Sequence, residues 1–200
     1  MVFFDIIKCE SRNQMKTLKT KRLILRDFKI SDVNDFFAYA SVPGVGEDAG
    51  WPHHQTISES ETVLKNFIAR GNEYAIVYKE NKKVIGSMGI YDKLDLTIYE
   101  NNNQKEIGYV LSKEHWGKGL MTEALKRVIA HLFDEIHVYA LWCYHFDFNH
   151  RSQRVIEKCG FKFIRNEITE ATHLNKKYNS CVYCLLNDDY QMQKREIHHE

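Results

Sequence analysis

Proline is scarce in this sequence, at 2 of 200 residues, which leaves little room for a disordered linker or a low-complexity segment. An excess of either charge is also missing, because 28 lysines and arginines stand against 27 aspartates and glutamates and give a formal net charge of +1. A near-neutral chain lacks the broad basic face of a duplex-binding protein. We therefore expect no nucleic-acid partner.

Long apolar runs are absent too, since none approaches the roughly 18 residues that a membrane-spanning helix needs. Residues 1–8 lack the basic start of a secretory leader, and Asp5 and Lys8 interrupt their apolar character. The five cysteines are odd in number and scattered, which does not suggest a disulfide framework. We expect a cytoplasmic protein that does not associate with a membrane.

Metal binding is not expected either. Cys181 and Cys184 lie three residues apart in a segment rich in β-branched and aromatic residues, so a strand would point the two thiols to opposite faces. This arrangement favours buried thiols over a zinc or redox pair. The histidines show no metal-ligand spacing of the His-Glu-x-x-His kind.

The length suits one domain, and the hydrophobic periodicity predicts a mixed α/β fold with a central sheet of about six to seven strands. The predicted strands are residues 23–28, 74–78, 84–91, 106–111, 138–146, 161–165 and 181–186. The predicted helices are residues 31–40, 58–70, 120–133 and 151–158, the second capped by Ser58 and Glu61. We place an N-terminal extension at residues 1–17, the domain at 18–190 and a frayed tail at 191–200.

The sharpest motif runs from Glu106 to Thr122 and comprises a strand, a glycine turn and the start of a helix. The first backbone N–H groups of a helix have no partner within the helix and carry the positive end of its dipole, so they can bind a phosphate. Gly117 and Gly119 allow that backbone to approach an anion closely. The Rossmann and Walker spacings are not met, which leaves a different pyrophosphate cradle or a plain tight connection.

A second motif, Asn149-His-Arg-Ser152 followed by Glu-Lys-Cys-Gly-Phe at 157–161, comes directly after an apolar strand. Together with Trp-Gly-Lys-Gly-Leu-Met at 116–121, it resembles the GNAT superfamily of acyl-CoA-dependent N-acyltransferases. The segment from Thr20 to Asp27 and the Gly-Trp-Pro at 50–52 are similar to the branch that contains ribosomal-protein N-terminal acetyltransferases. The resemblance extends over about residues 18–188.

This resemblance implies a GNAT fold, with a mixed and mostly antiparallel sheet that splays between its fourth and fifth strands, residues 106–111 and 138–146. It also implies that acetyl-CoA is the acyl donor and binds in the splay. The cofactor-binding residues it implies are Leu111, Trp116, Gly117, Lys118, Gly119, Leu120, Met121, Thr122, Asn149 and Ser152. Trp116 and Met121 depart from the usual loop residues, but backbone groups bind the phosphates.

The catalytic residues follow from the same resemblance. Glu106 stands where the family places a general base, although a solvated charge is the simpler interpretation of a glutamate after a polar turn. Many members carry a tyrosine as general acid where this chain has Ile156. Ser152 is therefore the candidate proton donor, with a structural or cofactor-binding role as the alternative.

Trp51 and His53, in the loop between the first two helices, are the candidate acceptor-binding residues. The alternatives are core packing for Trp51 and simple solvation for His53 and His54. The expected activity is acetyl transfer to a primary amine, with a protein or peptide N-terminus as the first candidate. The alternatives are a polyamine or aminoglycoside acetyltransferase and, because of Ile156, a non-catalytic acyl-CoA-binding module. We expect a monomer or a homodimer.

Overall fold

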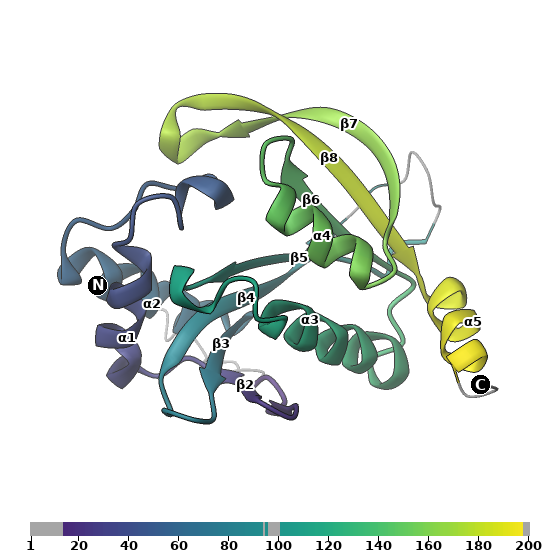
Figure 1. The fold of residues 1–200 in the computed structure, drawn as a ribbon, viewed down its shortest axis with the longest axis horizontal. Coiled ribbons are helices and arrows are strands. Elements are labelled where there is room, and N and C mark those ends of the chain that lie inside the picture. The colour runs from purple at the N-terminus through teal and green to yellow at the C-terminus, as the bar shows by residue number, and fades with distance from the viewer. Residues whose placement is uncertain (1–13, 94, 96–100, 198–200) are drawn as a thin grey trace, which may run out of the picture.

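The computed structural model describes residues 14–93, 95 and 101–197, which form one eight-stranded sheet with the strand order β1-β2-β3-β4-β5-β6-β8-β7 (Figure 1). The strands are β1 (Leu18–Lys19), β2 (Leu23–Asp27), β3 (Glu73–Tyr78), β4 (Val84–Lys93), β5 (Gln104–Leu111), β6 (Ala140–Phe146), β7 (Lys162–Ala171) and β8 (Lys176–Leu186). The helices are α1 (Val33–Ala40), α2 (Ile57–Arg70), α3 (Leu120–Ala130), α4 (His150–Lys158) and α5 (Asn187–Ile197). The predicted mixed α/β architecture is confirmed.

The splay between β5 and β6 is the feature of the sheet that positions the site. All other neighbouring strands pair antiparallel, whereas β5 and β6 are parallel and pair only from Gln104 opposite Ala140 to Glu106 opposite Trp142. Beyond Glu106 the two strands diverge. These are the fourth and fifth strands predicted from the sequence, so the predicted position of the splay is confirmed.

Helices pack on both faces of the sheet. α1 and α2 cover one face through a core that includes Phe36 and Leu64, and we call it the α1/α2 face. The larger core, which includes Leu125 of α3 and Ile156 of α4, covers the opposite or α3/α4 face. Strand β5 serves both, because alternate side chains of a strand point to opposite faces.

Alternate residues of β5 point to the two opposite faces of the sheet. Ile107, Tyr109 and Leu111 belong to the core beneath α3 and α4. Val110 packs into the core of the α1/α2 face, and by alternation Gly108 and Glu106 lie on that same face. Consecutive residues of β5 therefore reach the splay from its two sides.

Several local predictions differ from the structure. Helix α2 begins at Ile57, one residue earlier than expected, because the Thr56 side chain accepts a hydrogen bond from the Glu59 N–H and acts as the cap in place of Ser58. The two-residue strand β1 gave no sequence pattern, so the sheet has eight strands where about six to seven were predicted. The last hairpin, β7–β8, is also longer than predicted.

The C-terminal segment is helical where a frayed tail was expected. Helix α5 continues to Ile197, and three of its side chains bond to the Asp134 carboxylate: the Tyr190 hydroxyl, the Gln191 amide and the Lys194 ammonium group. A charged and hydrogen-bonded anchor of this kind fixes a helix that has little apolar surface of its own.

The cysteines behave as predicted in the part of the chain that the structure describes. Cys184 lies in a small core with Trp142, whereas Cys181 packs against the α3/α4 core, so the two thiols point to opposite faces. All four described cysteines are free thiols, and Cys9 lies outside the described residues. Among the described helices, none has the length and apolar character to cross a bilayer.

Candidate active site

A cleft of about 340 Å³ occupies the splay between β5 and β6. Its walls come from the end of β5, the glycine loop before α3, the end of β6 and the start of α4. Nine of the ten predicted cofactor-binding residues line it: Leu111, Trp116, Gly117, Gly119, Leu120, Met121, Thr122, Asn149 and Ser152. The tenth, Lys118, is an exposed residue of the same loop.

The glycine loop has the geometry of an anion site. Gly117 and Gly119 adopt left-handed backbone conformations with φ of 73° and 72°, and a Cβ atom built on Gly117 would meet nothing within 4 Å. Gly119 is the N-cap of α3, so the N–H groups of the first helical turn face the cleft region without intrahelical partners. The open backbone and the helix dipole suit the pyrophosphate of a CoA thioester.

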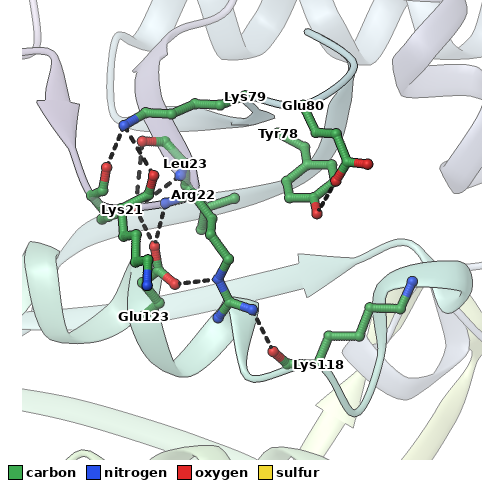
Figure 2. A network of polar contacts seen from close by, with 9 residues as sticks. Lys21, Arg22, Leu23, Tyr78, Lys79, Glu80, Lys118 and Glu123 are labelled. Carbon is green, nitrogen blue, oxygen red and sulfur yellow. Dashed lines mark hydrogen bonds and ion pairs between the residues drawn. The ribbon is translucent and has the colours of Figure 1, made fainter.

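Arg22 links the start of β2 to this loop (Figure 2). Its Nη1 donates to the Lys118 carbonyl over 2.9 Å, and its Nε donates to Glu123 Oε2 over 2.6 Å. The Thr20 hydroxyl and the Arg22 N–H also donate to the Glu123 carboxylate. Although partial burial alone would raise the pKa of Glu123, these hydrogen bonds lower it. The loop is thus tied to a neighbouring strand by a charged network.

Trp116 and Arg151 close one side of the cleft. The Trp116 Nε1 donates to the Leu111 carbonyl over 2.7 Å, and the Arg151 guanidinium lies 4.2 Å from the centre of the indole ring. Arg151 also forms an ion pair of 2.5 Å with Asp48, which belongs to the short helix η2 (Glu47–Ala49). The loop before α2 and the start of α4 therefore meet across the cleft.

Ser152 lies in the first turn of α4 and faces Tyr109 of β5. Asn149 caps the helix by accepting a hydrogen bond from the Ser152 N–H over 3.1 Å. The Ser152 Oγ lies 2.9 Å from the Tyr109 hydroxyl. Burial raises the pKa of Tyr109 well above its ordinary value, so this phenol stays protonated. Ile156 is fully buried in the core and supplies no hydroxyl.

Glu106 lies on the α1/α2 face, on the other side of β5 from Ser152. Its Oε2 accepts a hydrogen bond from the Lys93 ammonium group over 2.9 Å. Glu106 does not itself line the cleft, although the next residues, Ile107 and Gly108, do. The two candidate catalytic side chains thus approach the splay from opposite faces of the sheet.

Trp51 and His53, the two predicted acceptor-binding residues, stabilise their own loop and do not line the cleft. Trp51 packs over Gly46 and against the α1/α2 core. The His53 Nδ1 lies 2.6 Å from Glu47 Oε1. Slight burial alone would raise the pKa of Glu47, but hydrogen bonds from His53 and the Gly44 N–H lower it to about 2. The loop residues that do line the cleft are Val45, Asp48 and Ala49.

His54 differs from the expectation that it is a solvated loop residue. It is buried, its Nδ1 lies 2.6 Å from the Ser60 hydroxyl, and its ring packs edge-on against Phe36. Burial lowers the pKa of His54, which keeps the imidazole neutral. Its role is therefore structural.

Sequence reasoning missed other residues of the cleft. Tyr109 and Tyr144 lie on apolar strands, where an aromatic residue predicts core packing, and only the splay opens them to the cleft. Arg151, Arg154 and Lys158 also line the cleft, and because they recur at intervals of three and four residues along α4 they present one basic helix face to an anionic ligand. Within the described residues, no group of three potential metal ligands gathers.

Comparisons with known proteins agree with this geometry. The family model described as an acetyltransferase (GNAT) domain matches residues 22–162. The uncharacterized N-acetyltransferase p20 of Bacillus licheniformis is 30% identical over 129 residues, which are 62% of this chain and 70% of that protein. The uncharacterized N-acetyltransferase YoaA of Bacillus subtilis is 27% identical over 150 residues, 72% of this chain and 82% of that protein.

Solved structures share the fold. A GNAT-family acetyltransferase from Bacillus anthracis superimposes with a TM-score of 0.76 at 18% identity, covering 86% of this chain and 99% of that one. The ribosomal-protein-S5-alanine acetyltransferase of Vibrio fischeri gives a TM-score of 0.69 at 17% identity, covering 88% and 98%. The microcin C7 self-immunity acetyltransferase MccE, solved with acetyl-CoA and AMP, gives 0.70 at 18% identity, covering 83% and 93%.

The match of the family model to most of the chain, together with the splayed sheet and its glycine loop, determines the assignment. The chain belongs to the GNAT acetyltransferase family and is an N-acetyltransferase that uses acetyl-CoA.

Proposed function

We propose that the protein acetylates a primary amine by direct transfer, with the α-amino group of a protein or peptide as the first candidate acceptor. The observation that carries the proposal is the placement of Glu106 and Ser152 on opposite faces of β5, at the point where the sheet opens. A base and an acid are then available on the two sides of one reacting centre. The fold shared with a ribosomal-protein acetyltransferase supports the choice of acceptor.

The residues that would hold acetyl-CoA are those of the cleft. The backbone N–H groups after Gly117 and Gly119 would bind the pyrophosphate, and Asn149 and Ser152 at the start of α4 would border the pantetheine arm. When bound, acetyl-CoA supplies an acyl group that is activated as a thioester. The chain contributes orientation, which alone supplies a large part of the rate of such a transfer.

Proton transfer completes the proposed reaction. Glu106 accepts the proton that the amine loses as its nitrogen bonds to the acyl carbon, and Ser152 gives a proton to the sulfur as the carbon–sulfur bond breaks. For this, the Tyr109 hydroxyl must donate to Ser152 Oγ, which leaves the serine hydrogen free. If the Tyr109 hydroxyl donated instead to the Ser152 carbonyl, 3.3 Å away, the Ser152 hydroxyl would donate its hydrogen bond to the Tyr109 oxygen and could not protonate the sulfur.

Two alternatives to this proposal are testable. A polyamine or an aminoglycoside also presents a primary amine, and a module without transfer activity would bind acetyl-CoA alone. Incubation with radiolabelled acetyl-CoA and a panel of peptides, spermidine and kanamycin distinguishes them by which acceptor becomes labelled. Binding without labelling of any amine would contradict the proposed transfer.

The roles of the two residues need separate measurements. Glu106→Gln is expected to lower kcat/KM by about a hundred-fold or more, because the amide cannot accept the proton, and to change the pH dependence of kcat/KM. An unchanged kcat/KM and pH dependence would remove Glu106 from the mechanism. Ser152→Ala is expected to lower kcat, and a variant that raised only the KM for acetyl-CoA would show that Ser152 binds the donor without acting as the acid.

A further inference from the structure

Gly108 leaves a gap on the α1/α2 face of the sheet where β5 and β6 begin to diverge. It follows Glu106, the last residue of β5 that pairs with β6, by two positions, so both lie on that face. Gly108 also lines the cleft. The absent side chain therefore opens a path between the cleft and the α1/α2 face.

Tyr91 of β4 forms one wall of this gap. A Cβ atom built on Gly108 would lie 3.7 Å from Cε2 of Tyr91, and one built on Gly89 would collide with the Tyr91 hydroxyl. The ring thus lies across two neighbouring glycines, and its hydroxyl donates to the buried carboxylate of Glu73. Tyr91 keeps 36% of its surface exposed, although its hydroxyl is anchored.

Tyr144 of β6 forms the other wall. It stands two residues after Trp142, the pairing partner of Glu106, and therefore lies on the same face, across the splay from Gly108. Its exposed fraction is 38%, and it lines the cleft. Burial, together with the charges of Glu106 and Glu167, raises the pKa of Tyr144, so its ring stays neutral and lies within the field of Glu106.

Glu106 lies at the end of the gap, next to Tyr91 in the register of β4 and β5. Lys93 donates to Oε2 of this carboxylate, and within the described residues Oε1 has no hydrogen-bond donor. A carboxylate oxygen between two exposed aromatic rings suits an ammonium group, because the oxygen accepts its hydrogens and the ring faces attract its charge. An anionic or purely apolar group would gain neither interaction.

We propose that the gap over Gly108 is the acceptor site, in which Tyr91 and Tyr144 bind the primary amine in its cationic form and direct it to Glu106. The ammonium gives one proton to solvent before its nitrogen attacks, and Glu106 accepts the second as the bond to the acyl carbon forms. This inference rests on the proposed function and deepens it, because it names the residues that select the acceptor. Trp51 and His53 are not part of this site.

Gly108→Ala and Gly108→Val test the gap directly. The added Cβ has space, since 3.7 Å from Tyr91 is ordinary van der Waals contact and the residue is not in a left-handed conformation, so both variants should fold. Gly108→Ala is expected to raise the KM for the labelled amine by about ten-fold, and Gly108→Val by more. The KM for acetyl-CoA should change less than about two-fold.

The tyrosine rings are tested by a matched pair. Tyr144→Leu keeps apolar volume but removes the ring, and we expect a loss of about five- to thirty-fold in kcat/KM for the amine. Tyr144→Phe keeps the ring, so its loss of kcat/KM should be several-fold smaller than that of Tyr144→Leu. Equal losses in both variants would contradict a role for the ring.

A binding measurement separates this site from catalysis. CoA that carries an aminopropyl group on its sulfur, a conjugate that keeps a primary ammonium, should bind the wild-type protein more tightly than CoA does, measured by calorimetry. Gly108→Val should bind CoA like the wild type and lose that additional affinity. If amines are acetylated but the Gly108 variants leave the amine KM and conjugate affinity unchanged, the acceptor site is wrong and the proposed function stands. If no amine is acetylated, both fail.

Discussion

Arg22 and Lys118 lie 96 residues apart in the sequence, yet the Arg22 guanidinium donates to the Lys118 carbonyl over 2.9 Å (Figure 2). The same guanidinium is held by Glu123, in the first turn of α3. The carbonyl of a glycine-flanked residue is thereby fixed away from the cleft. This contact sets the direction of the N–H groups that follow it.

Arg22→Ala is expected to weaken the binding of acetyl-CoA without slowing the chemical step. Hydrogen bonds to charged groups contribute about 1.5–3 kcal/mol, so we expect the KM for acetyl-CoA to rise by about ten-fold while kcat at saturation stays near wild type. Lys19→Ala is the matched control, because Lys19 is an exposed residue of β1 and its loss removes the same charge. An equal effect in both variants would indicate general electrostatics and not loop geometry.

Tyr109→Phe is expected to lower kcat by about ten-fold, because the variant loses the hydrogen bond by which the Tyr109 hydroxyl orients Ser152, the proposed acid. The informative measurement is a double-mutant cycle with Ser152→Ala. In the Ser152→Ala background, Tyr109→Phe should have no further effect on kcat. Additive losses would show that Tyr109 does not act through the serine.

The ion pair between Asp48 and Arg151 is expected to hold the loop before α2 against α4. Asp48→Asn keeps the side-chain size and removes the ion pair, so the dissociation rate of acetyl-CoA should rise by a few-fold. In a double-mutant cycle with Arg151→Ala, the coupling energy should be about 0.5–3 kcal/mol. Stopped-flow measurement of acetyl-CoA release gives the dissociation rate of each variant. If Arg151→Ala alone changes the rate, Arg151 acts on the ligand directly and the pair with Asp48 is incidental.

The sequence predicts the parts of the site that depend on local geometry. The glycine turn and the Asn149 cap are such parts, since each is determined by a few neighbouring residues. The contacts between Tyr109 and Ser152 and between Arg151 and Asp48 join segments that only the folded sheet brings together. Neither has a local pattern.

The same reasoning explains the errors in the fold. The strand β1 has two residues, too few for any periodicity, and its pairing with β2 defines it. Helix α5 has few apolar residues, so its attachment to Asp134 could not be read from its own sequence. His54 was expected in solvent because its loop is polar, whereas packing against Phe36 and Ser60 buries it.

Glu73 provides a prediction about stability that does not depend on the acceptor. Burial raises the pKa of this carboxyl group to about 7, although the hydrogen bond from Tyr91 and the charge of Arg70 oppose the shift. An ordinary glutamate ionises near 4.5, so between these two values the folded protein binds more protons than the unfolded chain. The contribution of Glu73 to stability therefore decreases as the pH rises through this window and is most unfavourable above it.

Glu73→Gln should remove this penalty, because the amide oxygen can still accept the Tyr91 hydrogen bond and carries no charge to desolvate. We expect the variant to be more stable than the wild type above about pH 8, by on the order of 2 kcal/mol, and the difference to shrink toward about pH 4. Urea unfolding at a series of pH values measures this difference, with the exposed Glu114→Gln as control. A difference that is independent of pH would mean that Glu73 ionises equally in the folded and unfolded chain, and would remove the buried carboxyl as the cause.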